Sequence, residues 1–170
     1  YYVHMSTHLH IRTSYSLLES TIRIPSLLHT LKQMGYTQVV ISDHNVLSGL
    51  PLFMKVCKQE GIKGIAGIEI DVDYHEEKIP FLLIAKNRKG YQALMHLSSI
   101  VQMEKRPCTV EELQQASSSC FVIAYGEGGF LDGALTSDNR KEIQEKLDVL
   151  KQDFPYLDIA LSYQQSPLWY

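Results

Sequence analysis

Residues 37–45 read Thr-Gln-Val-Val-Ile-Ser-Asp-His-Asn, and this stretch decides the fold class of the chain. The apolar, β-branched run over residues 39–41 predicts a buried strand, and the polar residues after it mark the carboxyl end of that strand. Amphipathic stretches lie on either side, and they predict helices from Pro25 to the Gly35 stop and from Ser48 or Gly49 to Glu60. Helices that alternate with strands predict an α/β fold built from parallel βα units.

The same alternation continues along the chain. Further strands are expected over residues 8–12, 64–72, 79–85, 121–125 and 157–162, and further helices over residues 91–102, 109–116 and 139–153. Thr109 and Glu112 form a capping box at the start of one helix, and residues 75–78 are expected to form a hairpin loop. Because no linker or repeat divides the sequence, one domain over residues 5–170 is predicted, with residues 1–4 preceding a natural start at Met5.

The composition excludes several classes of protein. Of the 170 residues, 45% are hydrophobic, which is typical of a globular domain. The 16 basic and 19 acidic side chains give a net charge of −3, so the chain has no basic excess for binding nucleic acid. The three cysteines are far apart, which indicates reduced thiols in a cytoplasmic protein. The longest strongly apolar run, residues 81–85, is too short for a membrane-spanning helix.

Imidazole and carboxylate side chains gather at the ends of the first three predicted strands. They are His8 and His10 with Arg12 on the first strand, Glu19 in the loop after it, Asp43 and His44 after the second strand, and Glu69, Asp71 and Asp73 on one face of the third. Zinc, manganese and iron favour such ligands. Other interpretations stay open at this point: an exposed pair of histidines, an ordinary turn after the second strand, and the solvated face of an edge strand.

Three segments together resemble a known family. They are residues 8–19 (HLHIRTSYSLLE), 41–49 (ISDHNVLSG) and 61–69 (GIKGIAGIE), and a weaker likeness continues over residues 83–99. In order and spacing they are similar to the polymerase-and-histidinol-phosphatase (PHP) domain at the amino terminus of bacterial DNA polymerase III alpha subunits. The resemblance implies a distorted (β/α)7 barrel that binds up to three metal ions at its strand ends. It also implies that this chain is a fragment of a longer polymerase, truncated before the last strand of the barrel.

The resemblance implies candidate metal ligands at His10, Glu19, His44 and Glu69. Two further ligands of the family are replaced: Arg12 stands where the second histidine of a His-x-His pair is usual, and Pro80 falls where another histidine is usual. A family cysteine falls near Glu127, and the family's final Asp-x-His pair has no counterpart before Tyr170.

An arginine cannot ligate a metal ion, because its guanidinium group offers only donors and stays positively charged. We therefore expect Arg12 to occupy the vacated metal position and to pair with Glu69 or Glu19. The alternative, that Arg12 points into solvent, stays open at this stage.

Two functional classes follow from the resemblance. One is a structural and docking module of a replicative polymerase, with a degraded metal site and no catalytic residue of its own. The other is an active metal-dependent phosphoesterase or 3′–5′ exonuclease that uses the remaining ligands. The expected cofactor is none or a residual zinc or manganese ion, with magnesium in the parent polymerase. The expected partners are the rest of the polymerase chain, other replisome subunits, and DNA through the parent protein, with no membrane.

Overall fold

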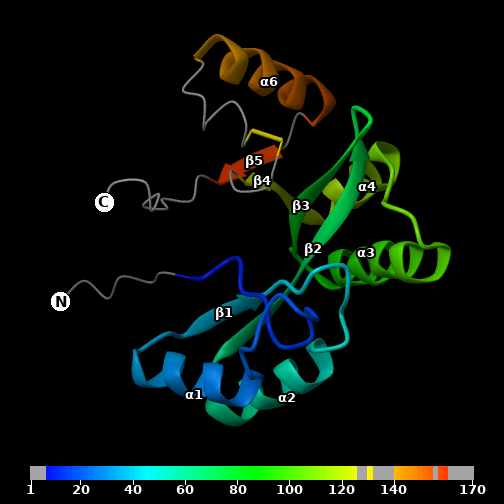
Figure 1. Cartoon of the computed structure of the whole chain (residues 1–170). Helices are drawn as coiled ribbons and strands as arrows, with labels where there is room; N and C mark the ends of the chain where they lie inside the picture. The colour runs from blue at the N-terminus through cyan, green and yellow to red at the C-terminus, as the bar shows by residue number, and fades with distance from the viewer. Residues whose placement is uncertain (1–6, 126–129, 132–139, 155–156, 161–170) are drawn as a thin grey trace.

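The computed structural model describes residues 7–125, 130–131, 140–154 and 157–160, and within them the chain forms one mixed sheet flanked by helices (Figure 1). The strands, in sheet order, are β1 Gln38–Ile41, β2 Lys63–Tyr74, β3 Glu77–Ala85, β4 Cys120–Tyr125 and β5 Leu157–Ala160. The helices are α1 Ile24–Gln33, α2 Leu50–Glu60, α3 Arg88–Ser99, the π-helix η1 Ile100–Glu104, α4 Val110–Ser117 and α6 Arg140–Asp153. The predicted α/β class is confirmed. The predictions at residues 1–4, at Glu127, at residue 139 and at residues 161–162 lie outside the described residues.

The predicted parallel pairing of strands holds for only two of the four described strand pairs. β1 pairs with β2 and β4 pairs with β5 in parallel, but β3 is antiparallel to both of its neighbours. The reversal occurs at His75 and Glu76, whose φ angles of 51° and 65° make the two-residue turn favoured between twisted antiparallel strands. The predicted hairpin loop is therefore confirmed, and it turns the chain back directly without a crossover helix.

The predicted first strand, residues 8–12, is not a regular strand. This amino-terminal segment lies beside β1, where the Val40 N–H donates to the His8 carbonyl at 3.2 Å and the Ser42 N–H donates to the Ile11 carbonyl at 2.9 Å. A step of two residues from Val40 to Ser42 is thus matched by a step of three from His8 to Ile11, and the extra residue interrupts regular strand pairing as a bulge does. The segment still brings the residues after Ile11 to the carboxyl end of β1.

Helix signals in the sequence match the structure closely. Gly61 ends α2 with a φ of 71°, in the left-handed region that favours glycine, and the Thr109–Glu112 capping box opens α4. The start of α3 is the exception, since it begins three residues before the predicted Tyr91. The Asn87 side chain accepts hydrogen bonds from the backbone N–H groups of Lys89 and Gly90 and so caps an earlier first turn.

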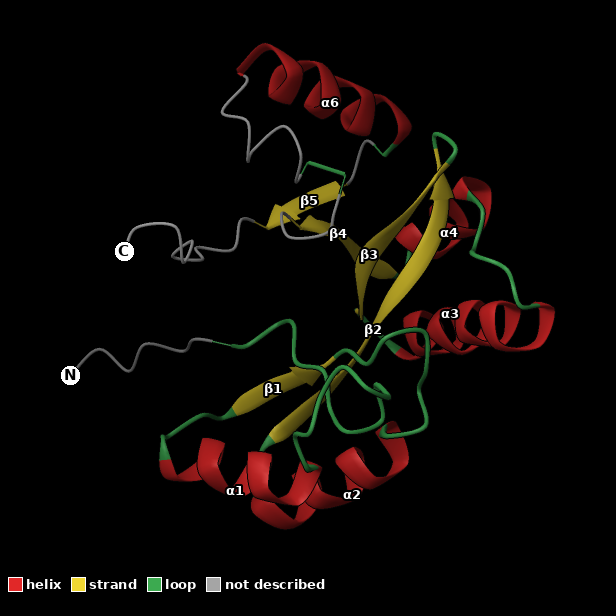
Figure 2. Ribbon diagram, in the orientation of Figure 1, coloured by secondary structure: helices red, strands yellow, loops and turns green. Residues whose placement is uncertain are grey.

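The two faces of the sheet differ, because the helices pack against one of them (Figure 2). The main core lies between the sheet and the helices, and β2 supplies the fully buried Ile68 and Ile70. A smaller apolar cluster lies on the other face, around Val40, Ile84 and Ile123. The three cysteines are all buried and unpaired. Among the helices of the described residues, none is both long and apolar enough to cross a membrane.

Candidate functional site

The candidate site lies where the amino-terminal segment and the end of β1 meet β2. Beyond β1 the chain continues beside β2, so that the Glu69 N–H donates to the Asp43 carbonyl and the Asn45 N–H donates to the Glu69 carbonyl, at 3.1 and 2.7 Å. These bonds make His44 and Glu69 neighbours in parallel register. The sequence prediction that these strand ends meet is confirmed.

Glu69 is the buried centre of the site, with only 1% of its side chain exposed. Arg12 donates from Nε to Oε2 at 2.7 Å and from Nη2 to Oε1 at 2.5 Å, and His10 Nε2 lies 2.6 Å from Oε2. Burial opposes ionisation of Glu69, but the bonds from His10 and Arg12 outweigh it and lower the pKa of the carboxyl to about 2. The solvated-face interpretation is therefore wrong for Glu69.

Arg12 also reaches a second carboxylate, because its Nη1 lies 3.3 Å from Glu19 Oε2. The expected pairing of Arg12 is thus observed with both Glu69 and Glu19, and the alternative that Arg12 points into solvent is wrong. About a third of the Arg12 and Glu19 side chains remains exposed, so this second ion pair lies at the mouth of the site.

His44 lies between two carboxylates. Its Nδ1 is 2.6 Å from Glu19 Oε1 and its Nε2 is 3.0 Å from Asp71 Oδ1. The hydrogen bond to Asp71, with support from Glu19, outweighs burial and raises the pKa of His44 to about 9. At neutral pH the ring is therefore a cation that donates from both nitrogens.

Asp71 belongs to the site although the sequence singled it out only as a face-mate of Glu69. It also accepts from Asn45 Nδ2 at 2.9 Å, and Lys78 Nζ lies 3.2 Å from its Oδ2. Despite burial, the bonds from His44 and Asn45 place the pKa of Asp71 well below its usual value. The period-two alternation along β2 was the signal that could have identified it. Asp73, the next residue on that face, is exposed as the solvated-face interpretation requires.

Pro80 lies on β3 directly opposite Asp71. The backbone groups of Asp71 bond elsewhere: its N–H donates to Asn45 Oδ1 and its carbonyl accepts from the Cys108 N–H. Asp71 and Pro80 therefore form a non-hydrogen-bonded pair of the antiparallel strands. The missing N–H of Pro80 breaks no hydrogen bond between β2 and β3. Pro80, where the resemblance predicts a histidine, thus adjoins the cluster, and its side chain has no atom that could bind a metal ion.

Asp43 supports the site from behind and was not predicted to do so. Its carboxylate, in a residue only 2% exposed, accepts from the Thr13 N–H at 2.6 Å, from the Thr13 hydroxyl, and from the Ser16 hydroxyl at 2.7 Å. Gly49 permits this close packing, since a Cβ there would lie 2.8 Å from the Tyr15 ring and 3.1 Å from Asp43 Oδ2. Asp43 therefore fixes the loop that carries Arg12 and Glu19.

The donor atoms of the candidate ligands do not fit a divalent cation in this arrangement. Both oxygens of Glu69 accept from Arg12, one of them also contacts His10, and the protonated His44 has no free lone pair. Three carboxylates, Glu19, Glu69 and Asp71, already face the three cations Arg12, His44 and Lys78, so a metal ion would meet a neutral cluster. Within the part of the chain that the structure describes, no group of three His, Cys, Asp or Glu side chains is arranged to bind a metal.

A mixed α/β fold with polar side chains collected at strand ends defines a domain of the kind that builds its site from strand termini and the loops after them. The sequence pattern of the PHP domain family matches residues 8–166. This chain belongs to the PHP domain family.

Relatives agree with this assignment, and a solved structure shares the fold. The chain is 34% identical over 163 residues to DNA polymerase III subunit alpha of Halalkalibacterium halodurans, which covers 91% of this chain and 14% of the relative. It is 41% identical over 101 residues to the protein of the same name from Campylobacter jejuni, covering 55% of this chain and 8% of the relative. The chain therefore spans a small part of the length of these relatives.

A crystal structure provisionally assigned as a metal-dependent phosphoesterase from Bifidobacterium adolescentis shares the fold. Its TM-score is 0.58 at 14% identity, and the match covers 92% of this chain and 75% of the other.

Proposed function

We propose that this chain is the PHP domain of a DNA polymerase III alpha subunit and that it is a structural and docking module in chromosome replication. DNA synthesis belongs to the rest of the polymerase chain, with magnesium as its cofactor, and DNA reaches this domain only through that parent protein. The names of the relatives and the match over residues 8–166 support this proposal. Its partners are the remaining polymerase domains and other replisome subunits, in the cytoplasm.

The observation that carries the proposal is the two-point hydrogen bond of Arg12 to Glu69. A guanidinium matches a carboxylate in geometry and brings a permanent charge, so it neutralises a buried Glu69 without a metal ion. In this proposal Arg12 replaces a metal ion of the PHP site and keeps the strand ends together. No hydrolytic step is assigned to the domain.

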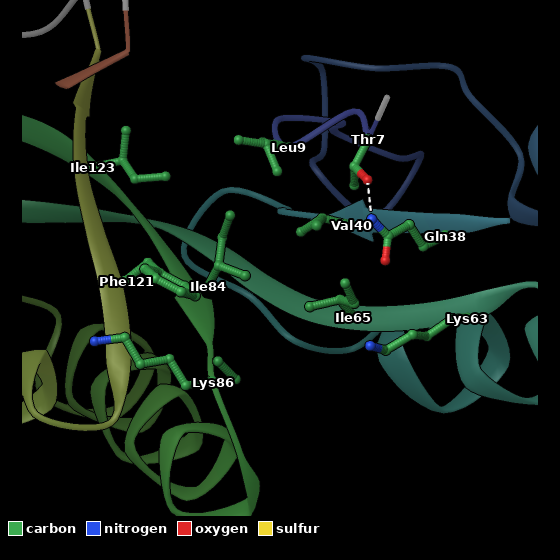
Figure 3. Close-up of a pocket in the computed structure, with 11 residues that line it drawn as sticks. Thr7, Leu9, Gln38, Val40, Lys63, Ile65, Ile84, Lys86, Phe121 and Ile123 are labelled. Carbon is green, nitrogen blue, oxygen red and sulfur yellow. Dashed lines mark hydrogen bonds between the residues drawn. The ribbon is translucent and has the colours of Figure 1, made fainter. Parts of the chain in front are cut away.

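We further propose that the sheet is part of a distorted (β/α)7 barrel whose last strand lies outside this chain. The support is a groove of about 540 Å³ on the sheet face opposite the main core (Figure 3). Its lining comes from strands and loops alone and includes the side chains of Val40, Ile65, Ile84 and Phe121. An apolar sheet face of this kind is normally covered in a complete domain.

The second candidate, an active metal-dependent phosphoesterase or 3′–5′ exonuclease, requires Arg12 to release Glu69 and His44 to lose its proton. The remaining ligand types, two histidines and two glutamates, would then suit a zinc or manganese ion. This candidate is therefore the competing outcome of the experiment below.

Metal content and hydrolysis of a generic phosphodiester, measured together on the purified protein, test the proposal. We expect less than a tenth of an equivalent of zinc or manganese and no turnover. The variant Arg12→His frees Glu69 and adds a nitrogen lone pair beside His10 and Glu19, so it should bind zinc at pH 8 without His44 as a ligand. Arg106→His, which changes an arginine paired with Glu104 and Glu112, should not. Stoichiometric metal with turnover that disappears in His44→Ala would instead establish the phosphoesterase.

A further inference from the structure

We propose that Leu17 and Leu18 form a docking tip that inserts into an apolar pocket in the remainder of the parent polymerase chain. This inference rests on the proposed function, because it requires that the domain be one part of that longer chain. It adds the place and the chemistry of the contact between the domain and its parent.

The tip is an unusual exposure of large apolar side chains. Leu17 is 81% exposed and Leu18 is 107% exposed, and Ile22 at the end of the same loop is 41% exposed. Other strongly exposed apolar residues of the described chain, such as Met34 and Met103, are flexible and stand singly. Two adjacent leucines that both face water differ from apolar residues that stand singly on a surface, and contact with a partner would account for them.

The loop beneath the tip is firmly fixed. The Ser14 N–H donates to the Ile22 carbonyl at 2.8 Å and closes the base of the loop, and the Ser20 hydroxyl donates to the Arg12 carbonyl at 2.8 Å. Inside the loop, the Ser16 hydroxyl donates to the buried Asp43. These bonds present the two leucines in one defined position, so the contact loses little conformational entropy when it forms.

The backbone at the tip supports the same conclusion. Leu18 has a φ of 65°, in the left-handed region where a leucine is unfavourable and glycine or asparagine is preferred. Neither the strained backbone nor the exposure of Leu18 stabilises the domain itself. A leucine at this position is explained if its side chain is buried by a partner.

The partner that buries Leu17 and Leu18 is another part of the same polymerase chain rather than a separate protein. Two leucines bury far less than the roughly 1,000 Å² that a stable interface between separate proteins needs, but a tethered partner is present at a high effective concentration. The relatives provide such a tether, since this chain covers only 14% of the Halalkalibacterium halodurans polymerase subunit. Glu19, which directly follows the tip, pairs with Arg12 and His44, so docking here also shields the outer ion pairs of the site from water.

The test compares the full-length polymerase with the 170-residue chain, each carrying Leu17→Ser with Leu18→Asn. In the full-length protein we expect amide exchange of residues 14–22 to accelerate at least fivefold, and proteolysis between this domain and its neighbour to accelerate similarly. In the 170-residue chain the double variant should unfold at the same or a higher temperature, because asparagine relieves the strain. The matched control Met103→Ser removes another side chain that is 81% exposed and should change neither protein.

Unchanged exchange and proteolysis in the full-length variant would overturn the inference while the proposed function stood. Loss of a dimer of the 170-residue chain in the double variant would also overturn it, since the occupant would then be a second copy. A natural gene that ends shortly after residue 170 would overturn the proposed function itself.

Discussion

Arg12 and Glu69 form a bidentate ion pair in which Nε meets Oε2 at 2.7 Å and Nη2 meets Oε1 at 2.5 Å. The two partners differ in their surroundings, because the Arg12 side chain is 36% exposed and that of Glu69 is 1% exposed. The arginine thus neutralises a carboxylate that water hardly reaches. Removal of the cation from such a pair leaves a buried charge, and that is more costly than loss of a surface ion pair.

We therefore expect Arg12→Ala to lower the free energy of unfolding by about 2–4 kcal/mol, the range for a buried carboxylate that loses its counter-charge. Urea denaturation at pH 7 measures this loss. Adding Glu69→Gln to the variant removes the uncompensated charge and should recover part of the stability.

Arg106→Ala is the matched control for this prediction. Its side chain is 37% exposed and also pairs with two carboxylates, but the more deeply placed one, Glu112, is 20% exposed. We expect a clearly smaller loss than for Arg12→Ala. Equal losses of unfolding free energy would show that the burial of Glu69 does not make its ion pair with Arg12 more stabilising than the more exposed ion pairs of Arg106.

His44 makes the stability depend on pH in the alkaline direction. Its pKa rises from 6.5 to about 9 on folding, so protonation favours the folded state. The contribution is complete below pH 6.5 and is lost as the pH rises to about 9, and it amounts to at most about 3 kcal/mol for a shift of this size. His44→Gln should flatten the fall in unfolding free energy between pH 6.5 and 9, whereas His29→Gln, on the exposed side of α1, should not.

A ring-proton titration by NMR gives an independent measure for His44. We expect the ring to remain protonated at pH 8. A midpoint near 6.5 would contradict the ion pairs with Glu19 and Asp71.

The sequence predicts the site better than it predicts the sheet. His10, Arg12, Glu19, His44 and Glu69 were each identified from their places at strand ends, and the structure brings them together. Strand ends are local features of the chain, and alternation along a strand tells which side chains share a face. The pairing of Arg12 with Glu69 or Glu19 was expected from the metal position that the resemblance assigns to Arg12, and only the structure decides it against an Arg12 that points into solvent.

Long-range geometry accounts for what the sequence did not predict. The role of Asp43 depends on Thr13 and Ser16, about thirty residues earlier, which reach it only because the amino-terminal segment lies beside β1. The hairpin at residues 75–78 was predicted, but the antiparallel pairing of β3 with β4 was not, because the two strands are separated by more than thirty residues of the chain.

Asp43 should be essential for the order of the site loop. In Asp43→Ala the Thr13 N–H and the hydroxyls of Thr13 and Ser16 lose their acceptor in a buried position, and we expect a loss of about 2–4 kcal/mol. Amide exchange at residues 13–20 should accelerate by more than the global loss of stability explains. Asp73→Ala, which changes an exposed carboxylate on β2, should alter neither measurement, and a similar effect of both variants would contradict this role.

Among the described residues, nothing covers the sheet face opposite the main core, and this exposure predicts self-association of the chain. Phe121 on β4 is 47% exposed and Leu9 in the amino-terminal segment is 43% exposed, and both line the groove of about 540 Å³ in Figure 3. Apolar surface of this extent favours contact with a second copy when nothing else covers it.

Phe121→Thr retains a residue that suits a strand but removes the largest apolar side chain of the groove. We therefore expect the dissociation constant for self-association, measured by sedimentation equilibrium, to rise at least tenfold. Leu52→Thr changes a side chain that is 37% exposed on α2, outside the groove, and should leave association unchanged. Equal effects of the two variants would show that the molecules associate through some other surface, because only Phe121 lies in the groove.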